Sequence, residues 1–215
     1  MVVAGGPEAR PDLVRDRIGE AQRYIAADGG YRHLTALGLP CDVLVGDFDT
    51  LSPGEVTAAQ RLGVTIEKHP PQKDQSDLEL ALAHAVLLGA DRITVIGALG
   101  GEWDHCLANL LSPLSYLGAR GVWGRLLTAE AEIYLCREGV LVESPGCRVS
   151  LQALSSQVTG LTLEGFQYPL NNAVLHRHQT LGLANRTLSE KARISFQSGE
   201  LFLTVISSLP ESSQP

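Results

Sequence analysis

The sequence has no apolar run that approaches the length of a membrane-spanning helix. Its first residues, Met1 to Gly6, also lack the basic and apolar segments of a secretory signal. Positive charge is scarce, with only three lysines and a net charge of −7 over 215 residues. Such a balance argues against a broad surface for the phosphate backbone of nucleic acids. We therefore expect a cytoplasmic protein that binds neither nucleic acid nor a membrane.

Cysteine pairs and the common nucleotide-binding loops are also missing. The four cysteines show neither CxxC spacing nor the density of a disulfide framework, so we expect reduced, mostly buried thiols and no structural zinc site. The chain contains neither the GxxxxGK[ST] pattern of a P-loop nor the GxGxxG pattern of a dinucleotide site. Any nucleotide site must therefore be built differently. The cysteines are Cys41, Cys106, Cys136 and Cys147.

The composition is that of an ordinary globular protein, 44% hydrophobic and 19% charged, and the length suits one large or two small domains. In the first half, short apolar strands alternate with segments of helical spacing, which indicates a mostly parallel sheet with helices on both faces. Strands are predicted at residues 2–4, 24–27, 43–45, 64–67 and 92–96, and helices at 12–24, 31–37, 53–62 and 76–88, with a further helix carrying Leu107, Leu110, Leu111 and Leu114 on one side.

The character of the sequence changes near residue 120. Glycines then punctuate short runs of Val, Leu and Thr every eight to fifteen residues, a pattern typical of an antiparallel β sandwich or barrel. We therefore predict an α/β domain over residues 1–120, followed by a β-sandwich domain over residues 121–215. The runs in the second half occupy residues 132–136, 148–153, 161–163, 192–197 and 201–206.

The run Val43 to Thr50 contains the most informative local pattern. An apolar strand ends at Gly46, and two carboxylates, Asp47 and Asp49, follow it with one residue between them. Open α/β sheets bind their ligands outside the carboxyl ends of the strands. In an extended chain both carboxylates point to the same side and repel each other unless a cation lies between them. A divalent metal with a phosphorylated ligand is one interpretation, and a turn in which the aspartates cap the backbone is the other.

Four polar clusters of the first half follow predicted strands, so a parallel sheet would gather them at one edge. Asp74 and Asp77 lie three residues apart at a helix start, where Ser76 and Glu79 also fit a capping box. Capping accounts for Ser76, but not for the two aspartates or for Lys73, which suits a phosphate contact. The clusters are Asp28-Gly29-Gly30, Asp47-Phe48-Asp49, Lys73 to Asp77, and Gly100 to His105 together with Asn109.

Three further patterns have a functional interpretation. The glycines within residues 97–101 could bring backbone amides close to a phosphate or ribose before a helix. His105 and Cys106 would form a Cys–His nucleophile only if both pointed to one place, whereas neighbours on a helix point in different directions. His176 and His178 can chelate a metal from a strand, but they lack an evident third ligand. We expect His105 to orient a carboxylate or to bind substrate.

Taken together, these motifs resemble those of the thiamine pyrophosphokinase family. The resemblance covers almost the whole chain, with the motifs in the family's order. In the first half it rests on Ala27-Asp28-Gly29-Gly30, Gly46-Asp47-Phe48-Asp49, Lys73-Asp74-x-Ser76-Asp77 and Gly100-Gly101-x-x-Asp104-His105-x-x-x-Asn109. In the second half it rests on Val149-Ser150-Leu151, Gly165-x-x-Tyr168-Pro169-Leu170 and Gly182-Leu183-Ala184-Asn185.

The resemblance implies an enzyme that transfers the pyrophosphoryl group of ATP to the hydroxyl of thiamine, giving thiamine diphosphate and AMP. It also implies Mg²⁺, a Rossmann-like α/β domain followed by a β sandwich, and a homodimer with sites at the subunit interface. The resemblance implies metal binding by Asp47, Asp49, Asp74 and Asp77, and catalysis by Lys73, Asp74 and Asp104. It implies nucleotide binding by Asp28, Gly29, Gly30, Gly100, Gly101, His105 and Asn109. It implies substrate binding by Asp77, Gly182 and Asn185.

The chemistry of that reaction agrees with these residues. Displacement at the β-phosphorus requires in-line positioning and charge neutralisation more than covalent catalysis. Carboxylates that hold Mg²⁺ on the triphosphate meet that requirement. One carboxylate, Asp74 or Asp104, can also accept the proton of the substrate hydroxyl.

Three positions depart from the family pattern. Glu102 and Trp103 stand where the family often has arginine, so one phosphate-binding cation is missing or relocated. Ser76 replaces the usual threonine and keeps the hydroxyl. Ala184 replaces a serine that commonly precedes the asparagine, which leaves the detail of thiamine binding open.

Two other functions compete with this one. A pyrophosphokinase for another hydroxymethyl heterocycle, such as a pterin, would use the same nucleotide and metal half, although the motifs of the second half favour thiamine. A non-catalytic sensor of nucleotide or thiamine would not need so many clustered carboxylates. The four intact aspartates therefore argue for the enzyme.

Overall fold

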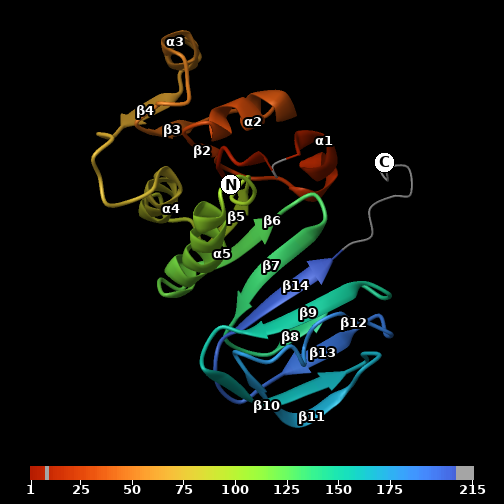
Figure 1. Cartoon of the computed structure of the whole chain (residues 1–215). Coiled ribbons are helices and arrows are strands. Elements are labelled where there is room, and N and C mark those ends of the chain that lie inside the picture. Colours follow the sequence, from red (N-terminus) through yellow and green to blue (C-terminus); the bar gives the residue numbers. More distant parts are fainter. Residues whose placement is uncertain (8–9, 207–215) are drawn as a thin grey trace. The chain divides into compact units, whose positions relative to one another are not determined.

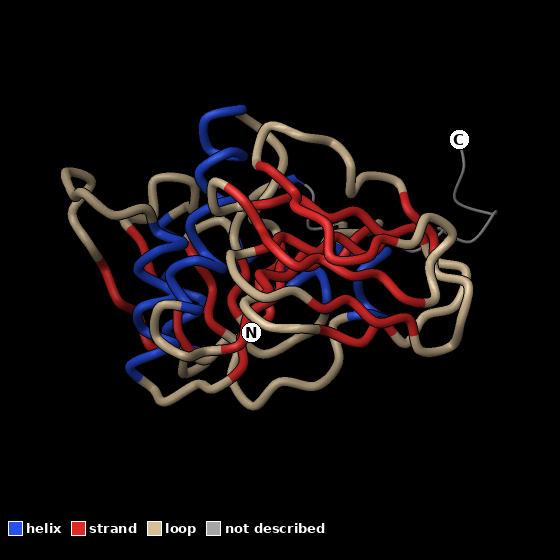
Figure 2. Tube along the Cα trace, turned by 90° about the horizontal axis from the view of Figure 1, so that it is seen from below, coloured by secondary structure: helices blue, strands red, loops and turns tan. Residues whose placement is uncertain are grey.

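The structure, a computed structural model, describes residues 1–7 and 10–206 (Figure 1). The chain divides into two compact units, Met1–Ala129 and Glu130–Pro215. Helices and strands alternate through the first unit, whereas the described part of the second unit is built from strands and loops (Figure 2). This order confirms the predicted fold class, an α/β part followed by an antiparallel β part.

The strands of the first unit form a parallel sheet in the order β6-β5-β1-β2-β3-β4. Its central strands are apolar and fully buried, as Val3, Ala26, Leu44 and Ile96 illustrate. Strands with such near-continuous apolar runs are typical of parallel sheets covered by helices. The strands are β1 (Val2–Val3), β2 (Ile25–Ala27), β3 (Val43–Gly46), β4 (Thr65–Lys68), β5 (Arg92–Ile96) and β6 (Trp123–Leu127).

Local signals set the helix ends. Ser52 caps α3 through a complete capping box with Glu55, in which each side chain bonds the backbone of the other residue. At the start of α4, Ser76 Oγ accepts a hydrogen bond from Glu79 N at 3.2 Å, one of the two bonds of the predicted box. Gly38, with φ 68°, ends α2. The helices are α1 (Pro11–Val14), η2 (Arg15–Arg17, a 3₁₀ helix), α2 (Gly30–Leu37), α3 (Pro53–Arg61), α4 (Asp77–Leu87) and α5 (Trp103–Gly118).

One predicted helix is shorter than expected, and the apolar side of another is only partly covered. The helix predicted over residues 12–24 is confined to α1 and η2, because Gly19 adopts φ 67° and leaves the right-handed helical path. In α5, Leu107 and Leu111 are exposed, whereas Leu114 is buried. The leucines of α5 therefore do not share one environment, and part of this apolar stripe faces solvent.

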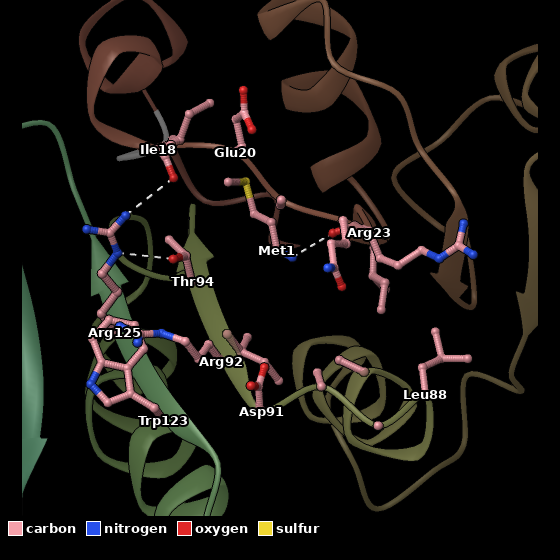
Figure 3. A pocket seen from close by; sticks show the side chains of 18 residues that line it. Met1, Ile18, Glu20, Arg23, Leu88, Asp91, Arg92, Thr94, Trp123 and Arg125 are labelled. Carbon is pink, nitrogen blue, oxygen red and sulfur yellow. Dashed lines mark hydrogen bonds between the residues drawn. The ribbon is translucent and has the colours of Figure 1, made fainter.

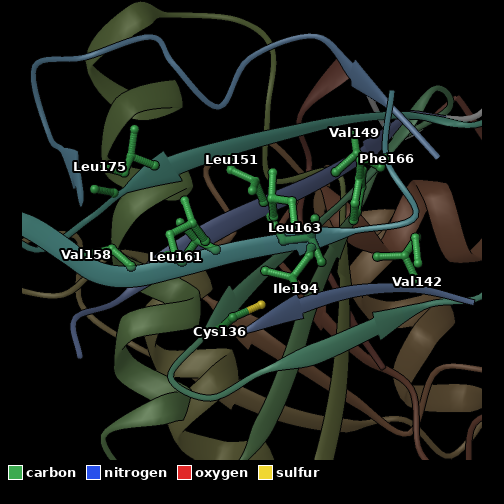
Figure 4. Packing of buried hydrophobic residues seen from close by; sticks show 14 residues of the cluster. Cys136, Val142, Val149, Leu151, Val158, Leu161, Leu163, Phe166, Leu175 and Ile194 are labelled. Atoms are coloured by element: carbon green, nitrogen blue, oxygen red, sulfur yellow. The ribbon is translucent and has the colours of Figure 1, made fainter. Parts of the chain in front are cut away.

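Two antiparallel sheets make up the described part of the second unit, in the orders β12-β9-β14-β7 and β11-β10-β13-β8. Buried side chains of both sheets, among them Leu151, Leu163 and Ile194, pack in one core (Figure 4). This packing confirms the predicted β sandwich. The strands are β7 (Ala131–Cys136), β8 (Val140–Val142), β9 (Arg148–Ala153), β10 (Gln157–Glu164), β11 (Leu170–His176), β12 (Asn185–Arg186), β13 (Ala192–Ser195) and β14 (Leu201–Ile206).

The strand β6 belongs to the first unit. All five of its residues pair in parallel with β5, from Trp123 opposite Arg92 to Leu127 opposite Ile96. The compact units accordingly divide after Ala129, whereas the boundary drawn from the sequence falls after residue 120.

The structure also bears on the thiols and on membrane association. The four cysteines are free; Cys136 is buried and the other three are half-buried, so the expectation of mostly buried thiols is met in full only by Cys136. None of the helices in the described ranges combines the length and the apolar character needed to cross a bilayer.

Candidate active site

A cavity of about 750 Å³ opens at the carboxyl edge of the parallel sheet in the first unit. The segments that follow β1, β2 and β5 line it, together with the segment that precedes α4. The topology of a parallel sheet brings these segments to one edge. The sequence predicts this for the segments after β2 and β5 and before α4, but not for the segment after β1. Predicted site residues in its lining include Asp28, Gly29, Lys73, Asp77, His105 and Asn109.

Glycines allow the loops around this cavity to approach one another closely. A Cβ atom at Gly30 would lie 1.9 Å from a carbonyl oxygen of β1, so α2 can start at this position only with glycine. Gly6 N donates a hydrogen bond to Gly97 O at 2.8 Å, which joins the loop after β1 to the loop after β5. Gly100 and Gly101, which line the cavity, adopt φ 87° and 83°.

Asp28 follows β2 and is buried, with 7% of its surface exposed. Its backbone lies in the left-handed region at φ 42°, which aspartate tolerates better than most residues. Thr50 Oγ1 donates a hydrogen bond to Asp28 Oδ2. The other carboxylate oxygen, Oδ1, is buried and has no hydrogen-bond partner among the described residues. Because burying an unpaired carboxylate oxygen is costly, this atom suits a cation or a hydrogen-bond donor from a ligand.

Lys73 joins two of the predicted clusters. Its ammonium Nζ lies 2.9 Å from Asp47 Oδ2 and 3.1 Å from Asp77 Oδ1. The side chains of Lys73 and Asp47 are only 12% and 11% exposed. Their hydrogen bond lowers the pKa of Asp47 and raises the pKa of Lys73, so both groups are charged at neutral pH.

Asp77 begins α4 and completes this group. Burial raises its pKa, the ammonium of Lys73 lowers it, and the charges of Asp47 and Asp28 raise it further. Its buried Oδ1 lacks a hydrogen bond of good geometry, although it is ion-paired with Lys73. A Cβ atom at Gly46 would lie 3.2 Å from both Asp28 Cβ and Asp77 Cγ, so the side chains of Asp28, directly after β2, and of Asp77 in α4 pack against one glycine of β3.

The sequence of the turn after β3 allows two interpretations, a backbone-capping turn and a charged site, and the structure contains features of both. Asp49 N donates a hydrogen bond to Asp47 Oδ1 at 3.2 Å, which is the backbone-capping turn. Asp47 Oδ2 accepts the hydrogen bond from Lys73, so the same carboxylate also joins the charged group. The side chain of Asp49 is exposed, and its role as a metal ligand stays a prediction.

A second cavity, of about 510 Å³, lies between α4 and α5 and shares His105 and Asn109 with the first. Asp74 and Asp104 line it, and both are exposed. Asn109 Nδ2 donates a hydrogen bond to Ala98 O at 2.8 Å, which fixes α5 against the loop after β5. The fourth predicted cluster therefore borders both cavities.

In the second unit, the side chain of Asn185 is hydrogen-bonded to backbone atoms. Its Oδ1 accepts hydrogen bonds from Tyr168 N at 3.0 Å and from Arg186 N at 2.8 Å, and its Nδ2 donates to Tyr168 O at 2.8 Å. Gly182 packs on β9, where a Cβ atom would lie 2.5 Å from Leu151 O. In this structure Asn185 positions the Tyr168 segment, and its contact with a substrate stays a prediction.

Comparison with known proteins covers both units. Residues 14–119 match the family model of the thiamin pyrophosphokinase catalytic domain, and residues 140–201 match that of the thiamin pyrophosphokinase vitamin B1 binding domain. A thiamine pyrophosphokinase of Bacillus subtilis is 30% identical over 209 residues, which cover 94% of this chain and 95% of the relative. The chain belongs to the thiamine pyrophosphokinase family.

Solved structures of thiamine pyrophosphokinases share this architecture. The crystal structure from Bacillus subtilis has a TM-score of 0.85 at 28% identity, covering 97% of this chain and 98% of that one. The structure from Geobacillus thermodenitrificans has a TM-score of 0.82 at 28% identity, covering 96% of each chain. The thiamin pyrophosphokinase of Candida albicans, 17% identical with a TM-score of 0.79 over 96% of this chain and 88% of that one, supports the fold alone.

The structure adds residues to those that the thiamine pyrophosphokinase motifs assign. Thr50 bonds Asp28, and its own carbonyl oxygen accepts a hydrogen bond from Arg32 Nη2 at 2.9 Å. Arg32 also pairs with Glu55 at 2.6 Å, 23 residues along the chain. Thr50 directly follows Asp47 and Asp49, so its hydroxyl could be identified from the sequence as a candidate site group. Arg32 could not be identified in this way, because its partners are distant in sequence.

Proposed function

We propose that the chain transfers the pyrophosphoryl group of ATP to the hydroxyl of thiamine, giving thiamine diphosphate and AMP, at the carboxyl edge of the first unit. Membership of the thiamine pyrophosphokinase family supports this diphosphotransferase reaction. One observation supports its location: the ammonium of Lys73 meets the carboxylates of Asp47 and Asp77 beside a cavity of about 750 Å³. A cavity of this size suits a nucleotide.

The loops of this edge suit the phosphates of ATP. Gly100 and Gly101 place no side chain between their backbone amides and the cavity. Helix α5 begins at Trp103, after Glu102 as its N-cap residue, and the positive end of its dipole favours an anion. We assign nucleotide binding to these loops together with Asp28, Gly29, Gly30, His105 and Asn109.

The donor set fits Mg²⁺, which prefers carboxylate oxygens and retains several waters. Asp28 Oδ1 and Asp77 Oδ1 are buried oxygens without a hydrogen bond, and Asp47 lies in the same charged group. We propose that Asp47 and Asp77 hold the ion with help from Asp49 and Asp74, and we add Asp28 to this set. When bound, Mg²⁺ would neutralise charge on the triphosphate and on the leaving oxygen.

The remaining chemistry falls to residues with fixed positions. Lys73 is held by two carboxylates and keeps its charge at neutral pH, because the hydrogen bond to Asp47 raises its pKa. It is therefore suited to contact the transferred phosphoryl oxygens. Asp74 and Asp104 line the adjoining cavity and are exposed to an incoming acceptor, so we assign one of them the proton of the thiamine hydroxyl.

We further propose that thiamine binds through the second unit, near Gly182 and Asn185, in a cytoplasmic homodimer with sites at the subunit interface. The match to a vitamin B1 binding domain over residues 140–201 supports the substrate. The exposed stripe on α5 supports the dimer, because Trp103, Leu107 and Leu111 are 88%, 59% and 38% exposed at successive four-residue steps. Isolated monomers seldom leave such a contiguous apolar surface in water.

A product assay with ATP, Mg²⁺ and thiamine tests the reaction. AMP together with thiamine diphosphate is the expected result. ADP with thiamine monophosphate would mean single phosphoryl transfer, and a chain that binds both substrates without turnover would be a sensor. A hydroxymethyl pterin offered as the acceptor tests the competing substrate class, and we expect no product from it.

The dimer has a separate test. Sedimentation of the wild-type chain should give the mass of two copies, and Leu107→Glu should shift it towards one copy. Leu62→Glu, at another strongly exposed leucine, is the matched control and should leave the mass unchanged.

A further inference from the structure

The carboxylate of Glu67 is held by two histidines. Glu67 belongs to β4, the edge strand of the parallel sheet, and its side chain is 37% exposed. Its Oε1 lies 3.0 Å from His69 Nε2, and its Oε2 contacts His84 Nδ1. A carboxylate only accepts hydrogen bonds, so His69 donates through Nε2 and His84 donates through Nδ1. One carboxylate therefore joins two imidazoles that come from different elements.

The contact with His84 ties Glu67 to the helix that carries Asp77. Helix α4 begins at Asp77, at the candidate active site, and reaches the opposite edge of the sheet, where Leu88 at its end lines another cavity (Figure 3). His84 lies seven residues after Asp77, so the two side chains lie on one face of the helix, about two turns apart. Glu67 is therefore fixed relative to Asp77.

The hydrogen bond from His69 ties Glu67 to the end of β3 as well. His69 N donates a hydrogen bond to Gly46 O at 2.9 Å, and Gly46 directly precedes Asp47. The backbone and the side chain of His69 are thus both fixed. The first bond sets the distance of His69 from Asp47, and the second sets its distance from Glu67.

The segment from His69 to Lys73 is short and stiff. Pro70 and Pro71 restrict its backbone, because their rings fix φ. Lys73 N donates a hydrogen bond to Pro71 O at 3.1 Å, which holds the end of the segment in a turn. A displacement of His69 is therefore passed on to Lys73 rather than absorbed by the chain between them.

The consequence of these contacts is geometric. Ion pairs as exposed as that of Glu67 contribute little to stability. We propose that Glu67 is a positioning residue, which holds the ammonium of Lys73 between the carboxylates of Asp47 and Asp77. This role rests on the proposed function, in which Lys73 contacts the transferred phosphoryl oxygens. A misplacement of about 1 Å can cost about a hundredfold in rate, so a residue that touches no substrate can still control turnover.

Steady-state kinetics provide the first test. Glu67→Met keeps the length of the side chain and removes both acceptors, so we expect kcat to fall about tenfold while the KM values for ATP and thiamine change by less than about twofold. Glu200→Met is the matched control, because Glu200 is 35% exposed and pairs with Arg137 at 2.6 Å. It should leave kcat unchanged. Equal losses in the two variants, or an unchanged kcat in a folded Glu67→Met, overturn the proposal.

A double variant shows whether Glu67 acts through Lys73. In the Lys73→Met background the group that Glu67 positions is absent, so adding Glu67→Met should lower the residual kcat by less than about twofold. A further tenfold loss of kcat in that background would mean that Glu67 acts by another route, contrary to the proposal.

His69 offers a second pair of variants. His69→Phe keeps a ring and removes the N–H donor, so it should reproduce the loss of kcat. His69→Gln retains an N–H donor and should recover most of the activity. If Glu67→Met proves poorly folded by circular dichroism, this pair decides alone. Equal kcat values in the two His69 variants contradict the proposal.

The position of Lys73 can also be observed without turnover. The chain has three lysines, so magnetic resonance of isotope-labelled lysine gives three sets of side-chain signals. The side chain of Lys73 is 12% exposed and that of Lys191 is 73% exposed. In Glu67→Met the signal of Lys73 should move towards that of Lys191, which should itself stay in place.

This measurement separates the two proposals. An unmoved Lys73 signal in Glu67→Met overturns the role of Glu67, even in a chain that makes thiamine diphosphate. A moved Lys73 signal in a chain whose wild type shows no turnover supports the placement of Lys73 by Glu67 and refutes the proposed function.

Discussion

The hydroxyl of Thr50 donates a hydrogen bond to one oxygen of the buried carboxylate of Asp28, while the other oxygen has no hydrogen-bond partner within the described residues. Arg32 holds Thr50 in turn by a hydrogen bond to its carbonyl oxygen at 2.9 Å. The carboxylate of Asp28 is therefore fixed through one oxygen and open at the other. Thr50 is a positioning residue for whatever Asp28 binds.

Replacing Thr50 tests this relationship. We expect Thr50→Val to lower kcat about tenfold, because loss of a hydrogen bond to a charged group costs about 1.5 kcal/mol. Thr50→Ser keeps the hydroxyl and should keep most of the activity. Steady-state kinetics decide between them, and a loss of kcat in Thr50→Ser with activity kept in Thr50→Val would assign the effect to the methyl group instead.

Lys73 should be required for turnover rather than for folding. Lys73→Met removes the ammonium between Asp47 and Asp77, so we expect kcat to fall about a hundredfold or more, as for other groups that stabilise charge in a transition state. Lys68→Met makes the same charge change at an exposed residue of β4 and should leave kcat unchanged. Similar losses of kcat in the two variants would assign the effect to the net charge of the protein instead.

Asp77 and Asp47 should affect stability with opposite signs. Burial raises the pKa of Asp77, so its favourable contribution belongs to the protonated form and is lost as the pH rises above the ordinary carboxyl value near 4. Lys73 lowers the pKa of Asp47, so its contribution is present above about pH 4 and is lost as the pH falls below that value.

At neutral pH we therefore expect Asp77→Asn to raise the melting temperature and Asp47→Asn to lower it, each by about 2 °C. Both variants should lose most of their turnover. Thermal melts at pH 7 and near pH 3 provide the measurement, and the two differences should shrink at the lower pH. Shifts of the same sign at pH 7 would contradict the assigned charge states.

Asn185 should contribute to the stability of the second unit. Asn185→Ala leaves Tyr168 N and Tyr168 O without their partner, so we expect unfolding to require about 3 kcal/mol less free energy. Asn171→Ala, at an exposed asparagine of β11, should change it by less than about 0.5 kcal/mol. Urea titrations measure both. If Asn185→Ala leaves the free energy of unfolding unchanged but raises the KM for thiamine, Asn185 instead contacts the substrate directly.

Strands could be predicted where an apolar run is bounded by turn residues. Residues 92–96, 148–153 and 201–206 coincide with β5, β9 and β14, because burial against neighbours on both sides requires such a run. The periodicity of α5 identified its apolar positions but not their surroundings. Whether Leu107 or Leu114 is covered depends on which elements pack beside the helix.

The candidate site could be predicted only as a region. The rule for parallel sheets brings the loops after β1, β2 and β5 to one edge, and the structure shows them lining one cavity. The pairing of Lys73 with Asp47 spans 26 residues, and that of Asn185 with Tyr168 spans 17. Such pairings depend on side-chain geometry that spacing alone does not contain.

The hydrogen bond from Gly6 N to Gly97 O joins the loop after β1 to the loop after β5, so the conformation of one depends on that of the other. A Cβ atom at Gly6 would lie 2.5 Å from the carbonyl oxygens of both Gly97 and Leu99, so any side chain there would push the second loop away. An engineer who wishes to change ligand preference at this edge must therefore redesign the two loops as a pair. In libraries that vary one loop and keep the other, most variants will have a distorted cavity.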